Sequence, residues 1–227
     1  MKTEVENFYV SYSDMVTLLL IFFVYLFSLS EIDPVKYLEA QNSINKEIKA
    51  TVDTRVLDKI NQEKKKLQQM QNEIQKFIKE NQLEKQVSVD FKNNKLELNM
   101  GDTVLFGVGS AELKVDAKNI LEKISSFFKT STSKIVVEGH TDDRPIRTSQ
   151  FPSNWELSAA RAASVVHFIE DQDIEPNRFL VVGYNQYLPI ALNDSEENRA
   201  KNRRVKITLQ VDVEKIMKDS QKARHKP

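Results

Sequence analysis

The sequence predicts a domain of the mixed α/β (α+β) class with two packed helices, preceded by a single membrane-spanning helix and a helical stalk. Three observations support this prediction. The chain opens with one long apolar run, continues through a polar stretch without proline or glycine, and ends in a region where strand-like and helix-like patterns alternate. Its 227 residues, 40% hydrophobic and 29% charged, have the composition of an ordinary folded protein.

The overall charge argues against a nucleic-acid partner. The formal net charge is zero, so no basic field would draw the chain onto a phosphate backbone. The absence of cysteine excludes disulfides and thiolate metal sites but selects no cellular compartment.

Residues 8–30 are expected to form the membrane helix, after a short tail over residues 1–7. A helix of about 20 residues crosses a bilayer core, and this run is long enough. A cleaved signal peptide is the alternative. The acidic start, the length of the run and the aspartate inside it favour a retained helix.

Asp14 is the only charged residue of this run. An ionised carboxylate there costs about 2.5 to 3.5 kcal/mol on insertion scales, which makes Asp14 a functional candidate. The alternative is that Asp14 lies close enough to the end of the helix to reach the membrane interface or to cap the helix.

Residues 31–43 should form a short amphipathic segment, because Pro34 interrupts the helix. Residues 44–86 should form the stalk. Apolar residues recur there at heptad spacing: Ile60, Leu67 and Ile74, with Met70 and Phe77. This pattern predicts a parallel dimer seam. Since Glu63 and Asn81 break it, a single helix lying on its own domain is the alternative.

Residues 87–212 read as one compact domain. Two alternating runs around Asn93 and Asn94 predict a hairpin. Amphipathic helices are expected over residues 115–128 and 154–170, the second capped by Asn154. Its expected apolar stripe is Leu157, Ala160, Ser164, Val165 and Phe168. Strands over residues 134–139, 179–183 and 205–211 complete a mixed sheet, and residues 213–227 form a polar, loose tail.

Arg161 lies four residues from both Leu157 and Val165, beside the inward-facing stripe, so it needs a partner. Asp142 and the residue after it follow a buried strand. Asp142 and Arg161 could bind the ammonium and carboxylate of a zwitterionic ligand, or they could form an internal salt bridge. His140 fits a structural role better than a metal site, because the chain has only three histidines.

Three stretches resemble the OmpA-like peptidoglycan-binding domain in the version that MotB proteins carry: GHTDDRPI (139–146), NWELSAARA (154–162) and ENRAKNRRVKI (197–207). The resemblance covers residues 104–209. SYSDMVTLLLIFFVYLFSLSEID (11–33) is similar to the membrane helix of MotB stator subunits.

The resemblance implies which residues bind the wall. Asp142 and Arg161 match the pair that holds the diaminopimelate of the wall peptide. Thr141, Asn154 and Leu157 match positions that shape the cleft. Arg203 and Arg204 match a basic pair of the family.

The resemblance also implies a non-enzymatic, flagellar-type stator subunit in which Asp14 binds and releases the transported ion, H⁺ or Na⁺, without a cofactor. A plug would follow the helix, with Val35, Tyr37 and Leu38 as its apolar edge. The implied complex is a dimer of this subunit within a pentamer of a MotA-like multi-helix partner. It would sit in the inner membrane with a cytoplasmic N-terminus and a periplasmic wall domain.

Two departures keep alternatives open. Only residues 1–7 precede the expected helix, and the stalk is short, which also suits the B subunit of a Zorya-type anti-phage motor. A passive tether between membrane and wall has no use for Asp14. A hydrolase is disfavoured because no nucleophile and base accompany Asp142.

Overall fold

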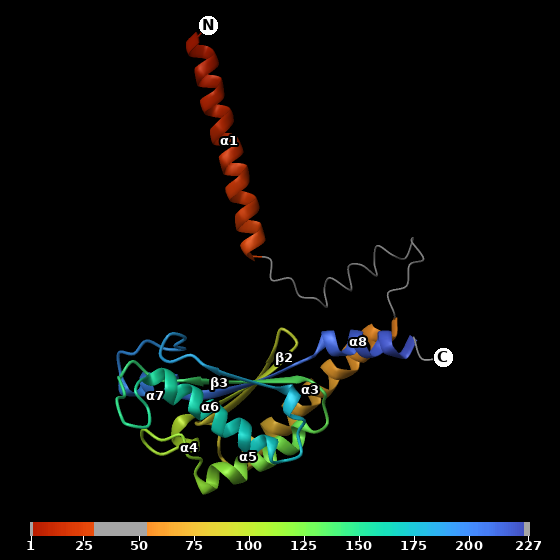
Figure 1. Cartoon of the computed structure of the whole chain (residues 1–227), viewed down its shortest axis with the longest axis vertical. Coiled ribbons are helices and arrows are strands. Elements are labelled where there is room, and N and C mark those ends of the chain that lie inside the picture. Colours follow the sequence, from red (N-terminus) through yellow and green to blue (C-terminus); the bar gives the residue numbers. More distant parts are fainter. Residues whose placement is uncertain (1, 30–53, 225–227) are drawn as a thin grey trace. The chain divides into compact units, whose positions relative to one another are not determined.

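The computed structural model describes residues 2–29 and 54–224 (Figure 1). They belong to two separate compact units, residues 1–53 and residues 54–227, and each is described by itself. The predicted plug residues Val35, Tyr37 and Leu38 lie outside the described residues, as does the stalk before residue 54.

The first unit is described through one helix, α1 (Lys2–Leu29), where the sequence predicted a helix. The side chains from Tyr12 to Leu26 are all exposed, and most of them are apolar. Within the described parts of the chain, no helix combines the length and the apolar character that a membrane crossing requires.

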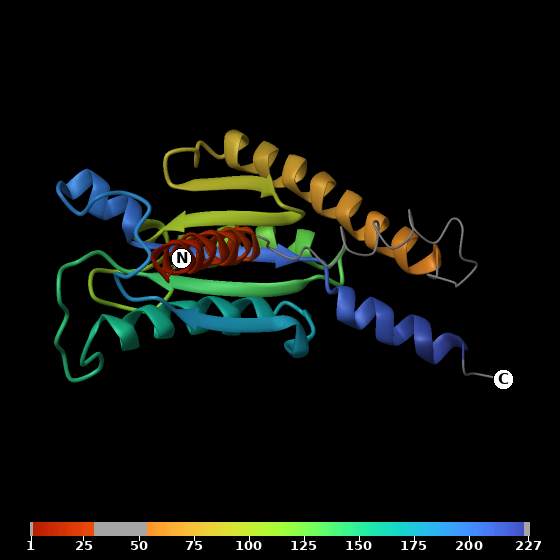
Figure 2. The same cartoon turned by 90° about the horizontal axis from the view of Figure 1, so that it is seen from above.

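The second unit is built on a five-stranded mixed sheet in the order β1-β2-β5-β3-β4 (Figure 2). The strands are β1 (Val87–Lys92), β2 (Lys95–Gly101), β3 (Lys134–His140), β4 (Phe179–Gly183) and β5 (Arg204–Gln210). Only β3 and β4 pair in parallel, and α6 (Asn154–Glu170) lies between them in the chain. Asn93 and Asn94 join β1 to β2 with φ of 51° and 60°, as a tight hairpin turn requires. The predicted mixed sheet and hairpin are confirmed.

Helices α3 (Thr54–Glu80), α5 (Val115–Phe128) and α6 pack with the sheet around one hydrophobic core. Figure 1 shows α5 and α6 along the same face of the sheet. The core joins alternate residues of the strands, such as Leu98 and Ile207, to Leu121 and Val165 of the helices. All of this core lies within residues 54–227, so the unit holds what it needs to fold alone.

The expected dimer seam is not available on α3. Its heptad residues are buried within the same chain: Ile60, Leu67, Met70 and Ile74 are each at most 1% exposed. The helix therefore lies on its own domain, because strands β1 and β2 and helices α5 and α8 of the same chain already cover its apolar stripe. Glu63, which interrupts the heptads, accepts hydrogen bonds from Ser131 Oγ at 2.9 Å and Thr132 N at 3.1 Å. The compact unit consequently begins at Thr54 rather than at residue 87.

Three other expectations need correction. The predicted loose tail forms α8 (Val213–Arg224), which packs against α3 and buries Ile216. The cap of α6 is Ser153, whose side chain accepts a hydrogen bond from Trp155 N. The helix is also turned from the expected orientation. Ala160, Ser164 and Phe168 are partly buried, whereas the buried face is Leu157, Ser158, Arg161, Ala162, Val165, Val166 and Ile169.

Candidate functional site

A cleft of about 610 Å³ opens in the second unit, where the loop after β3 faces the first turns of α6. The short helices α4 (Asp102–Leu105) and α7 (Glu196–Asn202) contribute its other walls. Gly139 makes this arrangement possible. A Cβ there would lie 1.9 Å from the carbonyl oxygen of Ser158, so only glycine lets α6 pack this closely on β3.

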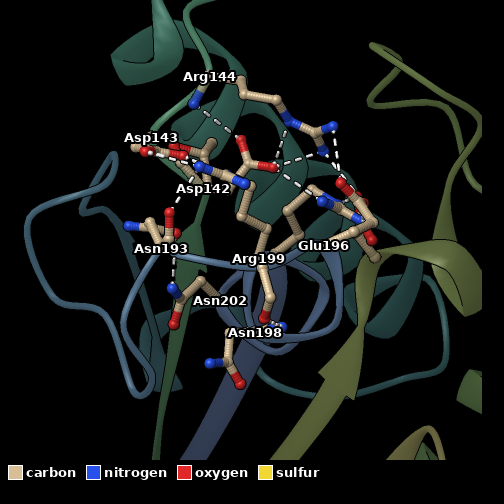
Figure 3. Close-up of polar contacts among 12 residues, drawn as sticks. Asp142, Asp143, Arg144, Asn193, Glu196, Asn198, Arg199 and Asn202 are labelled. Atoms are coloured by element: carbon tan, nitrogen blue, oxygen red, sulfur yellow. Dashed lines mark hydrogen bonds and ion pairs between the residues drawn. The ribbon is translucent and has the colours of Figure 1, made fainter.

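Asp142 lies in the cleft with a side chain that is only 6% exposed. Its Oδ2 accepts hydrogen bonds from Arg144 Nη2 at 2.6 Å, Arg144 Nε at 2.9 Å and Arg203 Nη1 at 2.8 Å (Figure 3). Its Oδ1 accepts one from the backbone N–H of Arg144 at 3.1 Å. Burial alone would raise the pKa of Asp142, but these hydrogen bonds outweigh it and lower the pKa below its usual value. The group is therefore a carboxylate at neutral pH.

Arg161 is buried on α6 and does not pair with Asp142. Its Nε donates to the carbonyl oxygen of Ser110 at 3.0 Å, and its Nη1 lies 3.3 Å from Asp102 Oδ2. The guanidinium carbon lies 5.2 Å from the ring centroid of Phe106. The expectation that Arg161 needs a partner is confirmed, and its acidic partner is Asp102. The alternative that Asp142 and Arg161 form a direct internal salt bridge is wrong. Asp142 pairs with Arg144 and Arg203 instead, and Arg161 pairs with Asp102.

Arg203 connects the two pairs. Its Nε lies 3.3 Å from Asp102 Oδ2, its Nη1 2.8 Å from Asp142 Oδ2 and its Nη2 3.0 Å from Glu196 Oε1. Burial alone would lower the pKa of Arg203. Its hydrogen bond to Asp142 and its other acidic neighbours outweigh burial and raise the pKa above its usual value. Arg161 and Asp142 thus belong to one alternating network of cations and anions that runs through Asp102 and Arg203.

The predicted cleft-shaping residues line the same cleft. Asn154 positions the loop after β3, since its Nδ2 donates to the carbonyl oxygen of Arg144 at 2.9 Å and its Oδ1 accepts from Ile146 N at 3.3 Å. Thr141 N donates to the carbonyl oxygen of Asn185 at 2.9 Å, which ties the end of β3 to the chain after β4. Leu157 supplies an apolar wall.

Arg204, the second residue of the predicted basic pair, is not among the residues that line the cleft. Its Nη1 donates to the carbonyl oxygen of Asn202 at 3.3 Å and its Nη2 to that of Leu188 at 3.2 Å. These contacts hold the loop that leads into α7. Arg203 has an extended backbone directly before β5, and Arg204 is the first residue of that strand. Neighbouring residues of an extended chain point to opposite sides, which explains the difference.

Three residues of the network were missed by sequence reasoning: Asp102, Arg144 and Glu196. Arg144 stands within GHTDDRPI, beside Asp142, so proximity to the motif was an available signal. Glu196 directly precedes the third motif. Asp102 follows an alternating strand and gives no comparable signal.

The acidic neighbour of Asp142 has a different role. Asp143 Oδ1 accepts from Arg199 Nε at 2.8 Å, and Arg199 Nη2 donates to the carbonyl oxygen of Asn193 at 2.6 Å (Figure 3). This pair fastens the loop after β3 to α7.

His140 is buried and stacks on Tyr184 with ring centroids 5.2 Å apart. In the parts of the chain that the structure describes, no group of three or more His, Asp or Glu could hold a metal ion.

Two family models match the chain in separate places. The model of the OmpA family matches residues 105–203, which include the cleft. The model described as membrane MotB of the proton-channel complex MotA/MotB matches residues 2–48.

Similar proteins match over almost the full length. "Motility protein B" of Bacillus subtilis is 30% identical over 237 residues, covering 90% of each chain. "Uncharacterized protein YtxE" of the same bacterium is 36% identical over 213 residues, covering 90% of this chain and 88% of that one.

Solved structures resemble the second unit. A putative MotB-like protein from Desulfovibrio vulgaris has a TM-score of 0.59 at 32% identity, over 63% of this chain and 90% of its own. The cell wall anchor of the type VI secretion system (T6SS) from Pseudomonas aeruginosa has a TM-score of 0.57 at 31% identity, over 60% of this chain and 96% of its own. With relatives matched along nearly their whole length, the chain belongs to the MotB family, whose C-terminal part is an OmpA-like domain.

Proposed function

We propose that this chain is the wall-anchored subunit of an ion-driven membrane motor. Its cleft would bind peptidoglycan, and Asp14 would bind and release the driving ion. The observation that carries the proposal is the order of the two family matches. A segment similar to the MotB of a MotA/MotB complex precedes an OmpA-family domain in one chain. The proposed partners are peptidoglycan, a MotA-like membrane subunit and a second copy of this chain.

The chemistry of the cleft suits a wall-peptide residue that carries both an ammonium and a carboxylate, such as diaminopimelate. Asp142 offers a carboxylate for the ammonium. Arg161 and Arg203 offer planar guanidinium groups, which bind carboxylates through paired hydrogen bonds. The burial of these groups strengthens each contact, because the effective dielectric constant is lower there than in water.

We further propose that α1 crosses the inner membrane, with the N-terminus in the cytoplasm and the second unit in the periplasm. The described residues of α1 do not meet the length and apolarity that a crossing requires, so the span is a proposal. Its support is the family match over residues 2–48 and the exposure of nearly all side chains from Met15 to Leu26 as apolar groups, with Thr17 as the one exception. Residues 31–43, with Val35, Tyr37 and Leu38, would then form a plug at the membrane surface.

Asp14 lies on α1 in a polar stripe. It shares a shallow hollow with Tyr9, Ser13 and Thr17, and Thr17 Oγ1 donates to the carbonyl oxygen of Ser13 at 2.7 Å. A carboxylate among hydroxyl groups, on a helix whose following residues are apolar, suits a site that exchanges a small cation with a partner subunit. A passive tether would gain nothing from this arrangement.

The test is Asp14→Asn in the full-length chain, co-expressed with its MotA-like partner. The amide keeps the shape but cannot carry the charge, so the complex should assemble while ion-driven work is lost. Asp14→Glu, which keeps a carboxylate on a side chain one methylene longer, serves as the matched control and should keep part of the work. Co-purification measures assembly, and cell motility or rotation measures work. Normal work by Asp14→Asn would make the carboxylate structural and leave a passive tether as the better description.

A further inference from the structure

Arg144 lies at the mouth of the cleft, and acidic groups hold its side chain at two places. Nε and Nη2 donate to Asp142 Oδ2 at 2.9 and 2.6 Å. On the other side, Nη1 donates to Glu196 Oε2 at 2.9 Å and Nη2 to Glu196 Oε1 at 3.3 Å (Figure 3). The Arg144 side chain is 54% exposed, whereas that of Asp142 is only 6% exposed. A half-exposed cation therefore covers a buried anion.

These contacts fill the acceptor positions of Asp142 Oδ2. A carboxylate has about four lone-pair sites, two on each oxygen. Oδ2 already receives two N–H groups of Arg144 and one of Arg203, and Oδ1 receives the backbone N–H of Arg144. Because the Asp142 side chain is only 6% exposed, a ligand ammonium can reach Oδ2 only if one of these donors leaves.

The donor that can leave is the Arg144 side chain. Arg203 is 17% exposed and is held by Asp102 and Glu196 as well as by Asp142. The backbone N–H of Arg144 is fixed by the loop, which Asn154 braces. The Arg144 guanidinium is the most exposed of the donors, and Glu196 can keep it when it leaves Asp142.

We propose that Arg144 is an internal competitor that occupies the ammonium position in the empty cleft and yields it to the ammonium of the wall peptide. This inference rests on the proposed function, in which Asp142 binds that ammonium. A ligand with an ammonium replaces one cation by another beside Asp142, whereas a ligand without one does not compete with Arg144 for this carboxylate. Arg144 thus lowers the affinity for ligands that carry an ammonium, and it keeps the buried carboxylate paired while the cleft is empty.

The competition can be measured by calorimetry on the full-length chain in detergent micelles. The probes are meso-diaminopimelate and pimelate, a dicarboxylate of the same chain length without amines. Arg144→Ala should tighten diaminopimelate binding on the order of 5-fold, the upper range for a partly exposed ion pair. Pimelate binding should not improve. Arg144→Lys, which keeps the charge but loses the planar fork, should give a smaller gain.

The matched control is Arg147→Ala, which removes the same charge from an exposed position on the same loop. It should leave diaminopimelate binding within 2-fold of the parent. Weaker binding by Arg144→Ala would make Arg144 a direct ligand contact, and unchanged binding would make it a loop brace. An equal gain for both probes would make it a steric cover. Each of these results overturns the competition.

Failure of the inference can be told apart from failure of the proposed function. If the parent protein binds diaminopimelate and pellets with purified peptidoglycan but Arg144→Ala brings no gain, the competition fails and the wall-binding function stands. If neither the parent nor Arg144→Ala binds the probe or the wall, the proposed ligand fails, and the competition fails with it.

Discussion

Arg161→Ala should destabilise the second unit substantially. Arg161 is 3% exposed and bonds to the carbonyl oxygen of Ser110 and to Asp102. Removing one partner of a buried ion pair costs about 3 to 5 kcal/mol, because the other charge is left buried without its counterion. Asp102 keeps Arg203 at 3.3 Å, so the expected loss lies at the lower end, about 3 kcal/mol.

The assay is thermal unfolding of a fragment of residues 54–227, which contains the whole core. For a unit of this size, 1 kcal/mol shifts the melting temperature by about 2 to 4 °C, so a drop of about 6 to 12 °C is expected. Arg147→Ala, at an exposed position, is the control and should melt with the parent. A melting temperature within about 2 °C of the parent for Arg161→Ala would refute the reasoning, because removing one partner of a buried ion pair should destabilise the fold by more than that.

Three further variants of the same fragment test the fold. Asp142→Ala should cost only about 1 to 2 kcal/mol, because both arginines it holds keep Glu196 as a partner. Ile74→Ala should cost about 2 to 5 kcal/mol. This loss of stability should be the same at all protein concentrations. If α3 formed a dimer seam, the loss would change with protein concentration. Hydrogen bonds from Lys66 and Ser131 lower the pKa of Glu63 although burial raises it, so Glu63 stabilises the fold above its usual pKa of 4.5. This stabilisation disappears as the pH falls through the lowered pKa, and Glu63→Gln should flatten the profile of melting temperature against pH.

The sequence was informative wherever a local pattern decides the structure. Alternation of apolar residues placed β1, β2 and β5, and two adjacent asparagines predicted the turn between the first two. The motif stretches brought Asp142 and Arg161 into one cleft. In each case the deciding residues lie within a few positions of one another or within a recognisable motif stretch.

The remaining features depend on contacts between distant residues. The heptads of α3 look the same whether a second copy or the chain's own sheet covers them, so periodicity alone could not choose. Glu63, the residue that interrupts the pattern, turned out to be the docking contact, through Ser131 and Thr132. Likewise, Asp102 is the first residue of α4, directly after β2 and 59 positions from its partner Arg161, and no local pattern links them.

Co-sedimentation of the fragment of residues 54–227 with purified peptidoglycan tests the central claim most directly. The parent should pellet with the wall. Asp142→Ala should remain in the supernatant while keeping most of its thermal stability, and Arg147→Ala should pellet like the parent. Arg161→Lys, which keeps the buried charge but not the planar fork, should pellet less than the parent. If folded Asp142→Ala pellets as fully as the parent, the cleft does not hold the wall peptide and the account of this site is wrong.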